Sequence, residues 1–318
     1  MLLAKGSQGQ LVLTLKANLL SHGYDLDSDD MFDQQTDDAV RDFQRENNLS
    51  ADGIVGPMTW MALNKDFLIN NYSLKRTPLK PVKEYKNDGS AMNDVYYRIA
   101  NSWGGLCHEL SRVIDIPLPS IYAVMAVESG GVSHTEMGMV IRFENHVFAR
   151  QPQVSKSWFD EHFRYSPRKV WQEHFYRQQP TEPWIQLHIS EGFTAEEKLN
   201  NSQYREWDAF NLARKHSTYA AMSSISMGLP QIMGFNYKLL GYNSVSDMFT
   251  AFNDSAHAQI LGMFDFIRSA KPNNQLLEAL KREDFESFAA GYNGPGQAEH
   301  YAGLIRRARS RVIELNIT

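Results

Sequence analysis

The most informative segment of the sequence is Pro117-Leu118-Pro119-Ser120-Ile121-Tyr122-Ala123-Val124-Met125-Ala126-Val127-Glu128-Ser129-Gly130-Gly131. Pro119 suits the first turn of a helix, and the two glycines suit its end. From Ile121 to Val127 every residue is apolar apart from one tyrosine hydroxyl, so we expect a helix over 119–129 that is buried on nearly all sides. Glu128 then lies in the last turn of a buried helix.

This position is expected to raise the pKa of Glu128. Burial disfavours the carboxylate, and the negative end of the helix dipole repels it. A carboxyl that stays protonated near neutral pH can donate a proton to a glycosidic oxygen, as a general acid must. From this helix alone, a glutamate that merely faces solvent is an equally good interpretation.

Two later segments end helices with glycine and proline and present polar side chains. The first is Ser226-Met227-Gly228-Leu229-Pro230-Gln231-Ile232-Met233-Gly234, which follows an Ala-rich helix. The second is Ala289-Ala290-Gly291-Tyr292-Asn293-Gly294, which presents Tyr-Asn on a loop. A glutamate at a helix end followed by these two turns indicates one cleft.

The order of these motifs resembles the lysozyme-like superfamily, which includes goose-type lysozymes and lytic transglycosylases. It is most similar to the N-acetylmuramidase domain of certain phage endolysins, which has Glu-Ser-Gly-Gly, Phe-Glu-x-His-x-Phe, Ser-x-Gly-x-x-Gln-Ile-Met-Gly and Ala-x-x-Tyr-Asn-Gly. Here these motifs are residues 128–131, 143–148, 226–234 and 289–294, in order, within residues 96–318.

The resemblance implies a mainly α, lysozyme-like catalytic domain over residues 96–318. It implies that Glu128 is the general acid and that Ser226, Gln231, Tyr292 and Asn293 bind the substrate. An amide can donate to and accept from an N-acetyl group, which suits Gln231 to a sugar cleft.

Glu144 is the next carboxylate to consider. Its apolar neighbours suggest a partly buried site, where its charge needs a partner such as Arg142 or His146. Two roles stay open: a second catalytic carboxylate that acts on water, or a structural ion pair that shapes the cleft. Asp208 and Glu136 are weaker candidates for a base.

The N-terminal region contains a short repeat. The segment at 29–36, Asp-Asp-Met-Phe-Asp-Gln-Gln-Thr, aligns with Asp-Gly-Ile-Val-Gly-Pro-Met-Thr at 52–59. In each copy a polar turn leads to two apolar residues and then to a threonine, Thr36 or Thr59, that we expect to cap the next helix.

With the helical patterns around it, this repeat resembles the small three-helix peptidoglycan-binding domain of many cell-wall hydrolases. We therefore expect a peptidoglycan-binding bundle at 1–64, a Pro- and Lys-containing linker at 65–95 and the catalytic domain at 96–318. Further helices are predicted at 96–112, 207–224, 255–269, 274–281, 284–290 and 297–314, with irregular structure at 133–205.

Composition excludes several classes of protein. The 318 residues are 42% hydrophobic and 22% charged, as in ordinary globular proteins, and the net charge of −5 argues against nucleic acid as a partner. One cysteine, Cys107, excludes an intrachain disulfide. No secretory signal pattern and no apolar run of membrane-spanning length is seen. We expect a monomer without stable membrane association, made in the host cytoplasm and acting on the cell wall after the membrane is permeabilised.

We expect no metal and no cofactor. Ten histidines invite a zinc interpretation, but His108-Glu109 is not followed by the second histidine of a His-Glu-x-x-His motif. Scattered ligands such as His134, His146 and His174 stay an open alternative, although the order of motifs explains the chain without a metal. The predicted function is therefore that of an endolysin that cleaves the β-1,4 bond between N-acetylmuramic acid and N-acetylglucosamine and lyses the host cell. The alternatives are a lytic transglycosylase, which gives an anhydro product, and a non-catalytic wall-binding virion protein.

Overall fold

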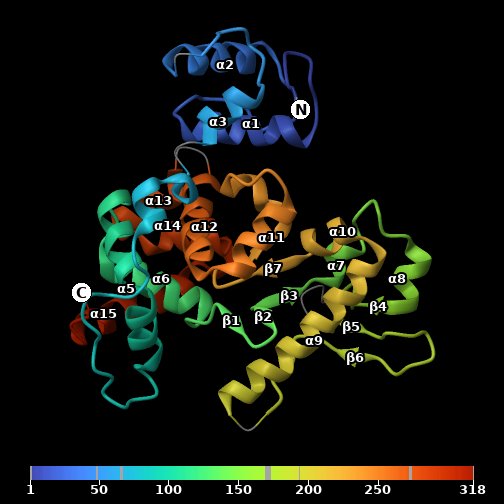
Figure 1. Ribbon diagram of the computed structural model, residues 1–318, viewed down its shortest axis with the longest axis vertical. Helices are drawn as coiled ribbons and strands as arrows, with labels where there is room; N and C mark the ends of the chain where they lie inside the picture. The colour runs from blue at the N-terminus through green and yellow to red at the C-terminus, as the bar shows by residue number, and fades with distance from the viewer. Residues whose placement is uncertain are drawn as a thin grey trace. The chain divides into compact units, whose positions relative to one another are not determined.

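The structure, a computed structural model, describes residues 2–47, 49–64, 67–168, 173–192, 194–271 and 274–317. The chain divides into two compact units (Figure 1). Unit 1 comprises Met1–Val127, Lys238–Gly241 and Leu261–Thr318, and unit 2 comprises Glu128–Tyr237 and Tyr242–Ile260. Each unit is described by itself. Helices dominate, as the sequence predicts for a mainly α protein.

Unit 1 begins with a bundle of three helices, which are α1 (Gln10–Ser21), α2 (Gln34–Glu46) and α3 (Pro57–Asn64) (Figure 1). Its core is one cluster of buried aliphatic and aromatic side chains that includes Val12, Leu15, Val40 and Phe43. Two isolated antiparallel bridges, Leu3 with Val55 and Gln8 with Met31, tie the repeated turns to the N-terminal segment.

The structure corrects the predicted cap of α2. Thr36 lies inside the helix, and the cap is Asp33, whose Oδ1 accepts hydrogen bonds from the Thr36 backbone N–H at 2.9 Å and from the Thr36 hydroxyl at 2.7 Å. Thr59 likewise lies within α3 and is buried, where its hydroxyl receives a hydrogen bond from Gln44. The prediction for Thr36 was wrong because a carboxylate three residues earlier offers a stronger acceptor to the helix N-terminus.

Short helices lie within the segment predicted as a linker. Residues 65 and 66 are outside the described residues, and η1 (Leu68–Asn70) and α4 (Tyr72–Arg76) follow them. The backbone N–H groups of Leu68 and Ile69 donate to the buried carboxylate of Asp265 at 2.7 and 3.0 Å. This part of the segment is therefore ordered by a specific contact, and the proposed domain boundaries stay a prediction.

The remaining helices of unit 1 agree closely with the predicted periodic segments. They are α5 (Asp94–Ile114), α6 (Leu118–Ser129), α12 (Ala256–Ser269), α13 (Gln275–Lys281), α14 (Phe285–Tyr292), η4 (Pro295–Gln297) and α15 (Ala298–Glu314), of which α6 and α12 extend into unit 2. The apolar side of α15 is buried, including Ile305 and Val312. Among the described residues no helix is both long and apolar enough to cross a membrane.

Unit 2 contains three small antiparallel sheets, which pair as β1–β2, β3–β7–β8 and β4–β5–β6. Their strands are β1 (His134–Thr135), β2 (Gly138–Met139), β3 (Ile141–Phe143), β4 (Phe163–Arg164), β5 (Phe175–Tyr176), β6 (Ile185–Gln186), β7 (Ile225–Met227) and β8 (Ile232–Met233). The helices of this unit are α7 (Asn145–Phe148), α8 (Lys156–His162), α9 (Ala195–His216), α10 (Thr218–Ser223), η2 (Gly234–Leu240, which ends in unit 1) and α11 (Val245–Asp254).

Two predictions are corrected in this unit. The helix predicted at 207–224 begins twelve residues earlier, at Ala195, where Thr194 and Glu197 form a capping box, and it stops at Ser217, which caps α10. The range 133–205, predicted as irregular, holds short strands and helices, with 169–172 and 193 outside the described residues. Strands of two or three residues are too short to show an alternating pattern.

Helix α9 completes the hydrogen bonds of β3 on the side that is not paired with β7. The amide of Gln203 receives a hydrogen bond from the Ile141 N–H at 2.8 Å and donates to the Ile141 carbonyl at 2.9 Å. The Phe143 N–H donates to Oε2 of Glu206 at 2.8 Å. Polar side chains of α9 thus take the place of a fourth strand, so these backbone groups at the buried edge of β3 have hydrogen-bond partners.

Candidate active site

Glu128 is the second-last residue of α6 and is half-buried. The residues before it, Ile121 to Met125, are fully buried, as the apolar run predicts. Gly130 and Gly131 adopt positive φ angles of 57° and 72°, the left-handed conformation that ends helices and that glycine adopts without strain. The Glu-Ser-Gly-Gly motif is therefore a helix terminus with a carboxyl group in its last turn.

Ser226 and Gln231 are brought together by the tight turn between β7 and β8. The Ser226 hydroxyl donates to Oε1 of Gln231 at 2.8 Å, and Nε2 of Gln231 donates to the Gly228 carbonyl at 2.7 Å. Gln231 itself has a positive φ of 48°, which is uncommon for a residue with a side chain. The amide of Gln231 closes its own turn, and this interaction was not foreseen from the motif.

A further residue that sequence reasoning missed supports this turn from α12. The fully buried amide of Gln259 accepts a hydrogen bond from the Leu229 N–H at 2.7 Å and donates to the Phe252 carbonyl at 2.7 Å. A Cβ atom on Gly228 would lie 2.5 Å from the Gln259 side chain, so only glycine fits there. Gly228, the glycine of the Ser-x-Gly motif, is thus explained by the close approach of the backbone to the Gln259 amide.

Tyr292 and Asn293 lie at the end of α14 in unit 1. The Tyr292 ring stacks on Phe288 at a centroid distance of 5.2 Å and meets the edge of Phe266 at 5.8 Å. Asn293 follows the last turn and donates its backbone N–H to the Ala289 carbonyl at 2.8 Å. Glu128, Ser226 and Gln231 belong to unit 2, whereas Tyr292 and Asn293 belong to unit 1.

Glu144 lies directly after β3, at the N-terminus of α7, with only 8% of its surface exposed. Its Oε1 forms an ion pair with Nε of Arg142 at 3.0 Å, and its Oε2 lies 3.4 Å from Nδ1 of His146. Burial raises the pKa of Glu144, and the Arg142 guanidinium opposes this shift. Both partners proposed from the sequence, Arg142 and His146, are therefore in contact with Glu144.

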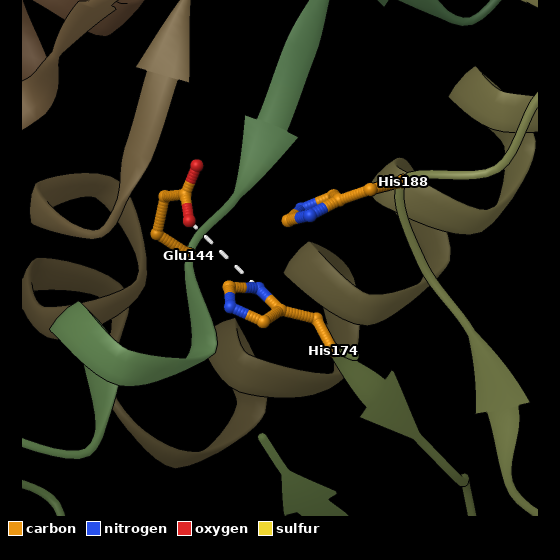
Figure 2. A group of neighbouring side chains, drawn as sticks. All are labelled: Glu144, His174 and His188. Atoms are coloured by element: carbon orange, nitrogen blue, oxygen red, sulfur yellow. Dashed lines mark ion pairs between the residues drawn. The ribbon is translucent and has the colours of Figure 1, made fainter. Parts of the chain in front are cut away.

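Two histidines distant in the sequence join Glu144. Nδ1 of His174 lies 3.8 Å from Oε2 of Glu144, and the His174 and His188 rings are 4.5 Å apart between centroids. Figure 2 shows the carboxyl group and the two imidazoles converging from three separate segments. Burial, followed by the charge of Arg142, lowers the pKa of His188 to about 3, so this ring is neutral at physiological pH.

Glu206 on α9 is a fully buried carboxyl next to this group. It accepts hydrogen bonds from the backbone N–H groups of Phe143 and His188 at 2.8 and 3.0 Å. Burial raises the pKa of Glu206 to about 8 in spite of these two donors. Sequence reasoning did not single out His188 or Glu206, because nothing in their spacing links them to Glu144 before the chain is folded.

The weaker base candidates are placed differently. Asp208 accepts hydrogen bonds from the Tyr176 hydroxyl at 2.8 Å and from the Gln178 amide at 2.9 Å, so its carboxylate is held within unit 2. Glu136 is exposed in the turn between β1 and β2. Cys107 is fully buried, as expected for a structural cysteine, and burial raises the pKa of its thiol above the usual range.

The comparisons with known proteins agree with the motifs. Residues 117–312 match the N-acetylmuramidase family, and residues 8–63 match a putative peptidoglycan-binding domain. The first match covers more than half of the chain, so the chain belongs to the N-acetylmuramidase family and is a glycoside hydrolase. Peptidoglycan is accordingly its substrate.

Among solved structures, the crystal structure of the Burkholderia AP3 phage endolysin is similar to this chain. The two share 23% sequence identity, the match covers 99% of this chain and 100% of that chain, and the TM-score is 0.48. No curated protein matches the chain.

Proposed function

We propose that the chain is a phage-type endolysin that hydrolyses the β-1,4 bond between N-acetylmuramic acid and N-acetylglucosamine, with Glu128 as the general acid. The observation that carries the proposal is the position of Glu128 in the last turn of a buried helix, within a segment that matches the muramidase family. The negative end of the helix dipole favours the protonated carboxyl, which is the form that can donate.

In the proposed reaction Glu128 transfers its proton to the glycosidic oxygen as the bond to the muramic acid carbon breaks. Water then attacks the oxocarbenium-like carbon and gives up one proton, which restores the protonated form of Glu128 and completes hydrolysis. A lytic transglycosylase would use the sugar's own 6-hydroxyl in place of water, and one acid would serve either route. The identity of the attacking oxygen is thus what separates the two activities.

The remaining motif residues are proposed to form the glycan site in two different ways. Gln231 uses its amide within the β7–β8 turn, and we propose that it and Ser226 act by holding that turn in shape for the substrate. Tyr292 is anchored by aromatic contacts at the end of α14, which suits a residue that presents a rigid hydroxyl to a sugar.

For Glu144 we propose a structural role. Its carboxylate is nearly buried and ion-paired with Arg142, and histidines approach its second oxygen. A base that activates water needs access to solvent and to the sugar ring, which this environment does not favour. Removing one partner from a buried ion pair is strongly destabilising, so Glu144 is expected to matter for stability.

The N-terminal bundle is proposed to hold the enzyme on the cell wall. The proposal rests on the match of residues 8–63 to a putative peptidoglycan-binding domain and on the compact core of that bundle. Synthesis in the host cytoplasm, access to the wall after membrane permeabilisation, and action as a monomer complete the proposed function.

Mass spectrometry of purified sacculi digested with the full chain tests this function. Hydrolysis by a muramidase predicts fragments with N-acetylmuramic acid at a free reducing end. Anhydro-muramic acid ends would mean a lytic transglycosylase, and reducing N-acetylglucosamine ends would mean that the other glycosidic bond is cut. Undigested sacculi would favour the non-catalytic wall-binding protein.

A further inference from the structure

The side chains of Glu144, His174 and His188 form a group outside the proposed acid site. One ligand atom from each residue lies within 4.8 Å of the ligand atoms of the other two (Figure 2). We propose that this group binds a divalent transition-metal ion of the zinc class, with a structural role. The proposal departs from the sequence-based expectation of no metal.

The donor set suits such an ion. Two imidazole nitrogens and one carboxylate oxygen are standard ligands of zinc, which is commonly bound by three protein ligands and a fourth group. Donor atoms about 2.0–2.1 Å from a tetrahedral zinc ion lie roughly 3.3 Å from one another. The observed spread of up to 4.8 Å therefore requires only a small closure of the side chains around the ion.

The hydrogen bonding of the Glu144 carboxylate is a second observation that favours a bound cation. Its buried Oε2 accepts no hydrogen bond from the described residues, although Nδ1 atoms of His146 and His174 approach to 3.4 and 3.8 Å. Buried carboxylate oxygens normally have hydrogen-bond partners. Two ring nitrogens that converge on one oxygen at such distances are the arrangement expected where a cation would link them, and His146 is the nearest further donor.

The hydrogen bond of the His188 ring to a backbone carbonyl determines which ring nitrogen can bind a metal ion. Nε2 lies 3.0 Å from the Phe143 carbonyl, which can only accept, so Nε2 carries the ring proton. The lone pair is then on Nδ1. Glu206 also lies near Nε2, at 3.8 Å, and a backbone carbonyl and a carboxylate are the usual outer partners of metal-binding histidines.

Arg142 is the group that must move. Its Nη2 lies 3.1 Å from Nδ1 of His188, and its Nε pairs with Oε1 of Glu144. The side chain of Arg142 is 41% exposed, in contrast to the buried ligands, so it can turn toward solvent when a cation takes its place.

A metal here would join two sheets. Glu144 follows β3 of the β3–β7–β8 sheet, whereas His174 precedes β5 and His188 follows β6 of the β4–β5–β6 sheet. The described contacts between these segments include two hydrogen bonds from the Asn145 amide, to the Arg164 and Phe175 carbonyls at 2.8 Å each. Metal binding would close the chain segments between the three ligands into loops, which stabilises the folded state by restricting the unfolded chain.

The test uses the full chain after removal of metals with EDTA, titrated with ZnCl₂ in a calorimeter and melted with and without zinc. We expect one zinc ion per chain, with a Kd of about 10 μM or tighter, and a melting temperature at least about 3 °C higher when zinc is in large excess over Kd. Glycan cleavage below the melting temperature should persist after EDTA treatment, because the proposed acid needs no metal.

The decisive variant is His188→Gln, with His134→Gln as its matched control. Both rings are partly buried in unit 2 and have Nε2 near a backbone carbonyl, at Phe143 and Asn253 respectively, but only His188 belongs to the group. Zinc affinity should fall at least about 100-fold in His188→Gln and stay unchanged in the control, since even outer partners contribute about 10- to 100-fold.

Circular dichroism must show that His188→Gln is folded, and if it is not, His174→Gln, at the other histidine of the group, provides the same comparison. Zinc binding weaker than about 100 μM in the parent chain would overturn the proposal. Equal affinity in the variant and the parent would overturn it as well, because the zinc would then be bound elsewhere.

Discussion

The turn that holds Gln231 allows a quantitative prediction. Gln231→Ala removes the acceptor for the buried Ser226 hydroxyl and the donor for the Gly228 carbonyl, whose hydrogen bonds measure 2.8 and 2.7 Å. A hydrogen bond contributes about 1 kcal/mol, and a buried group left without a partner costs about 1–3 kcal/mol. We therefore expect Gln231→Ala to lower the free energy of unfolding by about 2–3 kcal/mol.

Three companion variants sharpen this expectation. Ser226→Ala should cost about 1 kcal/mol, and adding it to Gln231→Ala should cost little more, because the two side chains share one hydrogen bond. Gln231→Gly loses the same hydrogen bonds but relieves the backbone, whose φ is 48°, so it should be more stable than Gln231→Ala by about 1 kcal/mol.

Thermal melts of the parent and the four variants, followed by circular dichroism, measure these differences at about 2–4 °C per kcal/mol. Glycan cleavage is measured in parallel well below the melting temperatures. Gln231→Ala with an unchanged melting temperature and a large fall in kcat/KM would refute the reasoning, because the amide would then bind substrate and not its own turn.

Three further predictions concern the domains, a buried carboxyl and a glycine. A chain without residues 1–64 should cleave solubilised glycan but sediment less with intact sacculi, and an isolated bundle that fails to bind purified peptidoglycan would contradict the assignment. Burial raises the pKa of Asp265 to about 7, so the stability that the protonated carboxyl contributes to the fold is fully present below about pH 4 and is lost as the pH rises through 7. In urea unfolding, the difference in free energy of unfolding between the parent and Asp265→Asn should therefore shrink by a few kcal/mol over that range. A constant difference would argue against the raised pKa. Gly234→Ala, whose Cβ would lie 1.9 Å from the Met222 carbonyl oxygen, should lose more than about 2 kcal/mol, whereas Gly296→Ala, with nothing within 4 Å, should melt like the parent.

The helices could be predicted where apolar residues recur over several turns. Residues 119–129 were expected to be a buried helix and form α6, because a run of apolar residues between a proline and two glycines admits few other structures. The capping of α2 by Asp33 and of α9 by Thr194 shows where prediction failed. Several polar residues near a helix start can all serve as caps, and tertiary packing selects among them.

The small sheets of unit 2 lay beyond prediction for a different reason. Ile141 pairs with Met227 across more than eighty residues of sequence, and each strand is only three residues long. Such pairing is determined by the helices that surround the strands, including the side chains that α9 directs at β3. The local sequence pattern therefore does not predict the pairing of β3 with β7.

The site was predictable in part. The motifs singled out Glu128, Gln231 and Tyr292, which stay proposed site residues, because they lie at helix ends and turns, where polar residues stand out against apolar runs. The surroundings of Glu144 were only half predictable. Arg142 and His146 are neighbours in the sequence, whereas His174 and His188 reach Glu144 through the β5–β6 hairpin, which brings its two ends together only after folding.

Glu128 is proposed to donate the proton to the glycosidic oxygen, and Glu128→Gln removes that proton. Glutamine keeps the size of the side chain and most of its hydrogen bonding but has no proton to transfer, so the variant should fold and should still bind sacculi. General acid catalysis contributes about 10²- to 10⁴-fold in rate, and the rate of release of reducing ends from sacculi should fall by at least about 100-fold. A folded Glu128→Gln protein that keeps more than about a tenth of the parent rate would contradict the assignment.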